Sequence, residues 1–304
     1  MQVKTKEKTK NMKKKLIFRG TATALITPFA AGSIDYPALD RLMESQIDSG
    51  IDALVIGGTT GEAATLSDKE RYTLYRHAVD RIAGRTKVIL GVGTNDTRAA
   101  CRHTRTAAAI GCDGVLSVTP YYNKGPEDGI VRHYLAQAEA ADIPLLLYNV
   151  PGRTGVNLTT RQLDILADCE NIVGLKEAGD SVDRLMALAA FGDRLPLYAG
   201  NDSQIYTVLS LGGHGVISVA SNAFPRAVGD VARLYAEGRH AESRKKQLSL
   251  MPLVHALFAE TNPTPIKYLM YLLGRCRPDM RLPLALPKEE TRALLRPFSD
   301  MADT

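Results

Sequence analysis

Short apolar runs alternate with longer amphipathic stretches along most of the chain. The short runs are rich in Val, Ile and Leu without strict polar alternation, which is typical of strands buried on both faces. Eight such runs predict strands at 20–27, 53–58, 87–93, 114–119, 144–150, 172–177, 196–200 and 215–220.

The stretches between these runs have helical spacing. The predicted helix at 37–49 begins with a proline and is followed by a glycine, and those at 68–83 and 97–110 also end just before a glycine. Strands that alternate with helices indicate parallel pairing. Eight such units in about 220 residues predict a (β/α)₈ TIM barrel. A doubly wound open sheet is the alternative that this pattern alone leaves open.

The chain beyond residue 239 has no strand pattern, and we expect helices there at 241–260, 265–273 and 288–295. We therefore divide the chain into three parts. These are a basic, disordered tail at 1–15, the barrel at 16–238, and a C-terminal helical extension at 239–304 that packs on the barrel.

The net charge of +5 comes from the tail, because residues 1–15 contain seven lysines and one glutamate while the remaining 289 residues balance 31 basic against 32 acidic side chains. Such a tail can bind nucleic acid or an anionic surface, or it can be a solvated extension, which we favour. No apolar run approaches the ~20 residues of a transmembrane helix. We expect a cytoplasmic enzyme with no nucleic-acid or membrane partner.

Neither the cysteines nor the histidines form a recognisable metal motif. The four cysteines are scattered without a C-x-x-C pair, which suits a reducing compartment. The six histidines show no metal-ligand spacing, so we expect no metal site.

Lys176 is the most unusual polar residue of the predicted strands. Strand alternation would place Ile172, Gly174 and Lys176 on one face, with Gly174 leaving space below the lysine. Burial lowers the pKa of an amine, and a neutral amine in an apolar pocket can form a Schiff base with a carbonyl substrate. The alternative is a lysine that reaches solvent or pairs with Glu177.

Tyr148 ends another predicted strand, on the face shared with Leu146 and Val150. A phenol there can relay the protons that Schiff-base chemistry moves. A core tyrosine with a satisfied hydroxyl is the alternative.

Two further strand ends offer groups that bind anions, at the end of the barrel where such enzymes have their sites. The Gly-Gly-Thr-Thr-Gly turn at 57–61 combines backbone N–H groups with the hydroxyls of Thr59 and Thr60, which suits a small carboxylate or phosphate. A tight turn without a ligand remains open. Arg153, in a Pro-Gly-Arg-Thr-Gly loop, can grip a carboxylate bidentately or lie in solvent.

Five motifs in the same order together resemble the dihydrodipicolinate synthase/N-acetylneuraminate lyase family. The similarity runs from about residue 18 to the C-terminal helices. The motifs are Gly-Gly-Thr-Thr-Gly-Glu at 57–62, Tyr-Tyr-Asn at 121–123, Tyr-Asn-Val-Pro-Gly-Arg-Thr-Gly at 148–155, Gly-Leu-Lys-Glu at 174–177 and Gly-Gly-His-Gly-Val-Ile-Ser at 212–218.

This resemblance implies a class I aldolase-type lyase that condenses pyruvate with L-aspartate 4-semialdehyde, the committed step of diaminopimelate and lysine biosynthesis. It implies no cofactor, because pyruvate forms a covalent imine on the enzyme. It also implies a homotetramer, built as a dimer of dimers.

The resemblance assigns a role to each candidate residue. Lys176 would form the imine, and a proton relay would consist of Tyr148, Thr59 and Tyr122, the last reaching in from a neighbouring subunit. The substrate-binding residues would be Thr60 for the pyruvate carboxylate, Arg153 for the semialdehyde carboxylate, and the backbones of Gly200 and Ile217 around pyruvate.

One departure concerns regulation. Members inhibited by lysine have two histidines and a glutamate around their allosteric cleft, where this chain has Asp68, Arg71 and Ala99, although Asn95 and Tyr121 remain. Without the glutamate, and with a repelling arginine, we expect weak or absent inhibition by lysine.

Two other functions stay open at this point. The first is a pyruvate lyase of the same family that acts on a 2-keto-3-deoxy sugar acid, against which Arg153 argues. The second is a non-catalytic ligand-binding or nucleic-acid-associated protein that uses the lysine tail, whose only support is residues 1–15.

Overall fold

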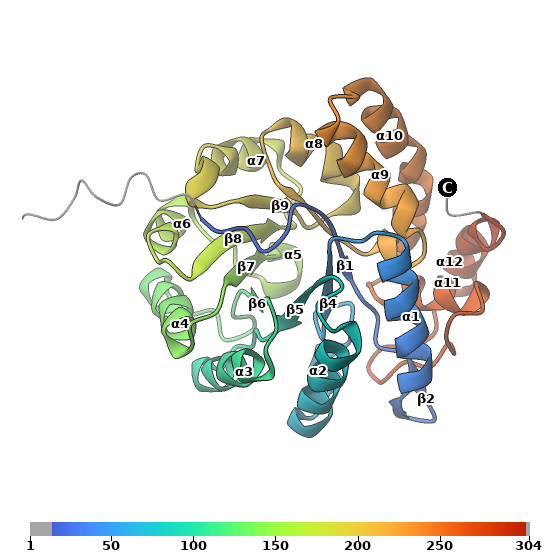
Figure 1. Ribbon diagram of the computed structural model, residues 1–304, viewed down its shortest axis with the longest axis horizontal. Helices are drawn as coiled ribbons and strands as arrows, with labels where there is room; N and C mark the ends of the chain where they lie inside the picture. The colour runs from blue at the N-terminus through green and yellow to red at the C-terminus, as the bar shows by residue number, and fades with distance from the viewer. Residues whose placement is uncertain (1–13, 302–304) are drawn as a thin grey trace, which may run out of the picture.

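In a computed structural model that describes residues 14–301, eight parallel strands close into a barrel and helices surround it (Figure 1). Neighbours in sequence are neighbours in the barrel, and β1 pairs with both β4 and β10 to close it. The barrel strands are β1 (Gly20–Ala24), β4 (Ala53–Ile56), β5 (Lys87–Gly91), β6 (Gly114–Val118), β7 (Leu145–Asn149), β8 (Ile172–Glu177), β9 (Leu197–Ala199) and β10 (Gly215–Ser218). The predicted (β/α)₈ barrel is confirmed, and each observed barrel strand lies within a predicted one.

The helices follow the strands as predicted. The described elements are α1 (Tyr36–Asp48), α2 (Asp68–Ile82), α3 (Thr97–Ile110), α4 (Glu127–Ala140), α5 (Pro151–Thr154), α6 (Thr160–Ala167), α7 (Val182–Ala189), α8 (Ile205–Ser210), α9 (Pro225–Ala236), α10 (His240–Leu257), α11 (Thr264–Leu272) and α12 (Glu289–Leu295), with a short antiparallel hairpin of β2 (Phe29–Ala30) and β3 (Ser33–Ile34). In the described part of the chain, no helix is both long and apolar enough to cross a bilayer.

Local sequence explains where the helices begin and end. Ser67 and Glu70 form a reciprocal capping box at the start of α2, and Asp96 caps the start of α3. Gly111 ends α3 with φ 92°, in the left-handed region that favours glycine.

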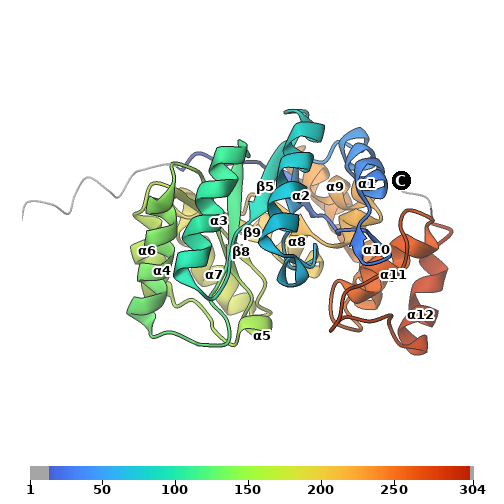
Figure 2. The same ribbon diagram turned by 90° about the horizontal axis from the view of Figure 1, so that it is seen from below.

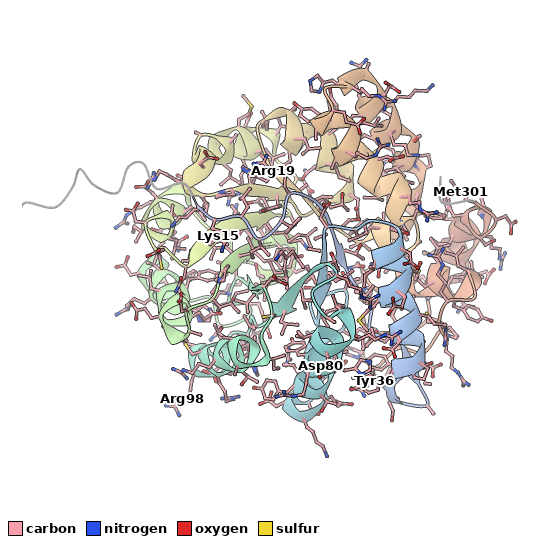
Figure 3. The ribbon with its side chains drawn as sticks, viewed as in Figure 1. Lys15, Arg19, Tyr36, Asp80, Arg98 and Met301 are labelled. Atoms are coloured by element: carbon pink, nitrogen blue, oxygen red, sulfur yellow. The ribbon has the colours of Figure 1, made fainter. Side chains whose placement is uncertain are left out.

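Two apolar layers form the core. One lies between the strands and the surrounding helices, and the other fills the barrel itself, where side chains occupy the centre of the ring of strands (Figure 3). Phe18 and Tyr198 stack with ring centroids 4.6 Å apart, and the Tyr198 hydroxyl donates to the Phe18 carbonyl. This pair closes the end of the barrel crossed by the first described segment, on which Figure 3 labels Lys15 and Arg19.

The folded part of the chain begins earlier than residue 16. Lys14 is 6% exposed, and its Nζ donates to the Cys169 carbonyl at 2.6 Å. Lys14 therefore belongs to the barrel and not to the predicted tail, whose residues 1–13 lie outside the described part of the chain.

Strand β8 differs from simple alternation. Its register with β7 shifts by one residue after the pair Leu145–Ile172, so that Ile172 packs in the layer under the helices and Val173 in the barrel interior. The prediction that Ile172 shares the face of Lys176 is therefore wrong. Gly174 leaves no open space either, because a Cβ there would lie 2.8 Å from the Pro196 carbonyl oxygen. This glycine instead allows β8 and its neighbours to approach closely.

The C-terminal extension packs against α9 through α10, and Figure 1 shows α11 and α12 outside the ring of barrel helices. Figure 2 shows α5 at the end of the barrel opposite to the first described segment. The loop between α10 and α11 reaches the same carboxyl end of the strands, because Asn262 in that loop contacts Thr60 and Arg153. Three separate parts of the chain thus meet where a barrel enzyme has its site.

Candidate active site

A cavity of about 450 Å³ opens at the carboxyl ends of β4 to β7. Its volume lies in the range of small-molecule sites. Of the predicted site residues, Thr59, Tyr148 and Arg153 line this cavity. Asn262 of the C-terminal extension, which was not predicted, also lines it.

A larger and more open hollow of about 1070 Å³ lies at the amino ends of the strands, lined by Arg19, Asp52 and His214 among others. None of the predicted site residues lines it. We place the chemistry in the smaller cavity, because barrel enzymes act at the carboxyl ends.

Lys176 is buried in β8 with 5% exposure, although it is an amine. Burial lowers its pKa to about 8, an effect that the charge of Arg153 reinforces and that of Asp202 opposes. The alternative partner, Glu177, is held instead by Asn149 and Arg184. Lys176 thus neither reaches solvent nor pairs with Glu177.

Tyr148 lies directly beside the lysine, since the two residues are register partners on β7 and β8. The Lys176 Nζ is 4.2 Å from the centroid of the phenol ring. Burial raises the pKa of Tyr148, while the charge of Arg153 and a hydrogen bond with the Thr59 side chain act in the opposite direction. The phenol therefore holds its proton at neutral pH and is linked to the turn at 57–61.

The two residues predicted to bind substrate carboxylates, Thr60 and Arg153, both contact Asn262 of the C-terminal extension. The Thr60 hydroxyl accepts a hydrogen bond from Asn262 Nδ2 at 3.0 Å, and Arg153 Nη2 donates to the Asn262 carbonyl at 2.8 Å. Thr60 is 3% exposed, and it is its neighbour Thr59 that lines the cavity.

Gly200 lies beside β8, and Ile217 lies in the barrel interior. The Gly200 N–H donates to the Glu177 carbonyl at 2.6 Å, and a Cβ at this position would lie 2.7 Å from that oxygen. Ile217 is fully buried in the barrel layer that also contains Tyr148. Neither residue lines the cavity itself.

Tyr122 is the one predicted catalytic residue that the single chain does not bring to the site. It is 86% exposed and lies outside the cavity lining, which contains its neighbour Tyr121. Its φ of 70° is unusual for a bulky side chain and is a conformation that tends to occur at functional sites.

Two buried residues of the site were not predicted. Asp202 is 1% exposed, accepts from the Val219 and Ala220 N–H groups, and its charge acts on Lys176. Asn262 joins Thr60 to Arg153. In the sequence, Asp202 is marked only by its place after a strand, and Asn262 only by its place before a proline. Both features are too common to indicate a site.

The described residues contain no group of three or more His, Cys, Asp or Glu side chains arranged to hold a metal ion. A buried lysine of lowered pKa beside a phenol, at the carboxyl end of a (β/α)₈ barrel, instead defines a lyase of the class I aldolase type.

Comparison with known proteins narrows the class to a family. The model of the dihydrodipicolinate synthetase family matches residues 17–298, and the chain belongs to that family. A Clostridium novyi protein named 4-hydroxy-tetrahydrodipicolinate synthase is 42% identical over 281 residues, covering 92% of this chain and 95% of the relative.

Solved structures agree with this assignment. The 4-hydroxy-tetrahydrodipicolinate synthase of Methylacidiphilum fumariolicum SolV matches with a TM-score of 0.90 at 42% identity, covering 92% of this chain and 94% of the other. A structure described as the first monomeric dihydrodipicolinate synthase variant matches with a TM-score of 0.90 at 38% identity, covering 92% and 95%. The family resemblance expected from the five motifs is confirmed.

Proposed function

We propose that this chain condenses pyruvate with L-aspartate 4-semialdehyde to give 4-hydroxy-tetrahydrodipicolinate and water, a step of lysine and diaminopimelate biosynthesis. The observation on which the proposal rests is the buried Lys176 amine beside the Tyr148 ring, with its pKa lowered to about 8. The names of the relatives supply the identity of the aldehyde.

The neutral Nζ of Lys176 adds to the ketone carbon of pyruvate, and the ketone oxygen leaves as water to give an imine. The imine withdraws electrons, so the methyl group loses a proton and becomes an enamine. The enamine carbon attacks the aldehyde and forms the new C–C bond. The amino group of the semialdehyde then attacks the imine carbon, closes the ring and releases Lys176. Since the imine is the electron sink, this sequence needs no cofactor.

Each of these steps moves a proton, and the phenol of Tyr148 lies beside the amine. Its raised pKa suits a phenol that donates to the departing oxygen and takes the proton back. We propose that Thr59 continues the relay and that Tyr122 of a second copy completes it. The exposed, strained position of Tyr122 fits a side chain that serves a neighbouring subunit.

Two anionic substrates need two separate sets of protein groups that bind their carboxylates. We assign the pyruvate carboxylate to Thr60 and the N–H groups of its turn, with the Gly200 and Ile217 backbones around pyruvate. We assign the semialdehyde carboxylate to Arg153, which lines the cavity and has a guanidinium that can bind a carboxylate.

A shared Tyr122 requires at least a dimer, and we propose a tetramer built from two such dimers. Exposed apolar side chains on α7 support the further contact, since Val182 and Met186 are 60% and 56% exposed. The four free cysteines fit a reducing compartment, for which we propose the cytoplasm.

A lyase acting on a 2-keto-3-deoxy sugar acid is the competing function. Supplying labelled pyruvate with each aldehyde acceptor in turn, and following the products by NMR, separates the two. We expect the cyclic product with aspartate semialdehyde and little turnover with sugar aldehydes. Preferential turnover of a sugar acid would contradict the proposal.

A further inference from the structure

We infer that Asn262 is a positioning residue that directs the Thr60 hydroxyl proton toward the carboxylate of pyruvate. The inference rests on the proposed function and adds to it a residue from the C-terminal extension. It concerns the orientation of one hydroxyl group, and not the chemistry at Lys176.

The geometry of this contact is well defined. Asn262 is 5% exposed, lines the cavity and lies 202 positions from Thr60 in sequence. Its Nδ2 donates to Thr60 Oγ1 at 3.0 Å in a buried environment. Such a bond between distant segments fixes the side chain of a residue that is itself 3% exposed.

The direction of this hydrogen bond decides what Thr60 can do. A threonine hydroxyl has one proton and rotates freely unless a partner fixes it. Because Asn262 donates to the oxygen, the Thr60 proton has to point to another acceptor. The carboxylate of pyruvate, when it is bound at the turn of residues 57–61, can be this acceptor. A hydrogen bond from the Thr60 hydroxyl to this negative group is charge-assisted.

The rest of the Asn262 amide argues against a purely stabilising role. Within residues 14–301, its buried Oδ1 has no hydrogen-bond partner. Burying an unpaired amide oxygen costs free energy, so an apolar residue of similar size would stabilise the fold at least as well. The amide is better explained by what its Nδ2 does to Thr60.

Asn262 contacts Thr60 and Arg153 with different atoms, so the binding of the two substrate carboxylates can be tested separately. Its side chain contacts Thr60, whereas its main-chain carbonyl accepts from Arg153. A substitution at position 262 keeps the carbonyl. Only the binding of pyruvate should therefore change, and the binding of the semialdehyde by Arg153 should remain.

The neighbouring contacts keep the two loops in place when the side chain is replaced. Glu62, two residues after Thr60, forms a fully buried ion pair with Lys267 of α11, and its second oxygen accepts from the Arg281 N–H. We therefore expect Asn262 variants to fold.

The test compares Asn262→Ala and Asn262→Asp with the parent enzyme and with Thr261→Ala, a substitution at an exposed neighbouring position. Two quantities are measured for pyruvate. These are the KM in the full reaction and the concentration that half-saturates inactivation by borohydride, which does not involve the second substrate.

Loss of an oriented, charge-assisted hydrogen bond predicts a roughly tenfold rise in both quantities for Asn262→Ala. Asn262→Asp should be worse, by about a hundredfold, because its carboxylate takes the Thr60 proton and repels the pyruvate carboxylate. The KM for aspartate semialdehyde should stay within about twofold in both variants, and Thr261→Ala should match the parent.

A merely structural role predicts the opposite order, because aspartate is the closest isostere of asparagine. Pyruvate dependence that is unchanged in both variants, or better preserved in Asn262→Asp than in Asn262→Ala, would overturn the inference. Thr60→Val gives a second test that does not depend on position 262. It should raise the pyruvate KM and add little in an Asn262→Ala background, and strictly additive effects would also overturn the inference.

The parent enzyme separates this inference from the proposed function. If borohydride traps no pyruvate on the parent, the proposed function fails. If the parent is trapped but the variants show unchanged pyruvate dependence, only the role of Asn262 fails.

Discussion

Tyr148 and Lys176 are direct neighbours across β7 and β8, and the lysine Nζ lies 4.2 Å from the centre of the phenol ring. The register of two parallel strands therefore places a proton donor beside an amine without any contribution from a loop. Sites built on strands hold their geometry more precisely than sites built on loops.

The pH dependence of imine formation should follow the amine of Lys176. Burial lowers its pKa to about 8 from the usual 10.5, so the neutral, nucleophilic fraction rises with pH. At pH 7 about a tenth of the enzyme should have a neutral amine. The rate of pyruvate trapping should increase up to pH 8 and then level off. A rate that still rises tenfold per pH unit up to pH 10 would show an unperturbed lysine.

The same shift predicts that the stability of the fold depends on pH. Because the folded pKa lies below the unfolded one, the unfolded state binds more protons between pH 8 and 10.5, and this lysine should favour folding increasingly over that range. Urea unfolding of the parent and of Lys176→Met across these pH values measures the difference.

Removing the Tyr148 hydroxyl should slow the reaction without disturbing the fold. Tyr148→Phe keeps the buried ring but removes the proton donor, so kcat should fall by roughly a hundredfold or more. Tyr198→Phe is the matched control, because that hydroxyl donates to Phe18 at the other end of the barrel. Steady-state rates compare the two, and an equal loss of kcat in both variants would argue against a relay through Tyr148.

Tyr122 should act in a neighbouring copy. Tyr122→Ala and Lys176→Ala should each be nearly inactive alone, but co-expressed copies should form mixed dimers with one complete site. Random pairing then predicts about a quarter of the parent activity. Mixed dimers without activity would place Tyr122 outside the partner's site.

The ion pair between Lys267 and Glu62 should matter for stability, because both side chains are fully buried. Lys267→Met leaves an unpaired carboxylate in the interior, which should cost about 3–5 kcal/mol of unfolding free energy. The double variant with Glu62→Gln should recover part of this loss. Urea denaturation measures both, and a loss below about 1 kcal/mol would mean that Glu62 finds another partner.

Lysine should inhibit weakly or not at all. The Arg71 guanidinium donates to the Tyr75 hydroxyl and to the Ala63 carbonyl, so the position of its positive charge is fixed. A lysine titration into the millimolar range at subsaturating pyruvate tests this expectation. Strong inhibition would contradict this expectation and would mean that another group accepts a hydrogen bond from the ammonium group of the bound lysine.

The barrel could be predicted because its signals are local. Apolar runs, helical spacing and glycines after helices predicted the elements to within a few residues, and the strand ends indicated where polar residues would meet. The shift in β8 could not be predicted, because it depends on pairing with β7 and not on the residues at 172–174. Alternation alone therefore placed Ile172 on the wrong face.

The candidate site was predictable only where a residue is unusual in its own strand. Lys176 was such a residue, since a lysine rarely occurs in an apolar strand. Asn262 was not, because its importance comes from a contact across 202 residues. Tyr122 shows a different limit, as one chain does not contain the site that we propose for it.

The most direct test of the account is reduction of the enzyme with borohydride in the presence of pyruvate, followed by mass spectrometry of its peptides. We predict a reduced pyruvate adduct on the peptide that contains Lys176, and none in Lys176→Met. An adduct on another lysine, or no adduct while the enzyme remains active, would contradict the assignment.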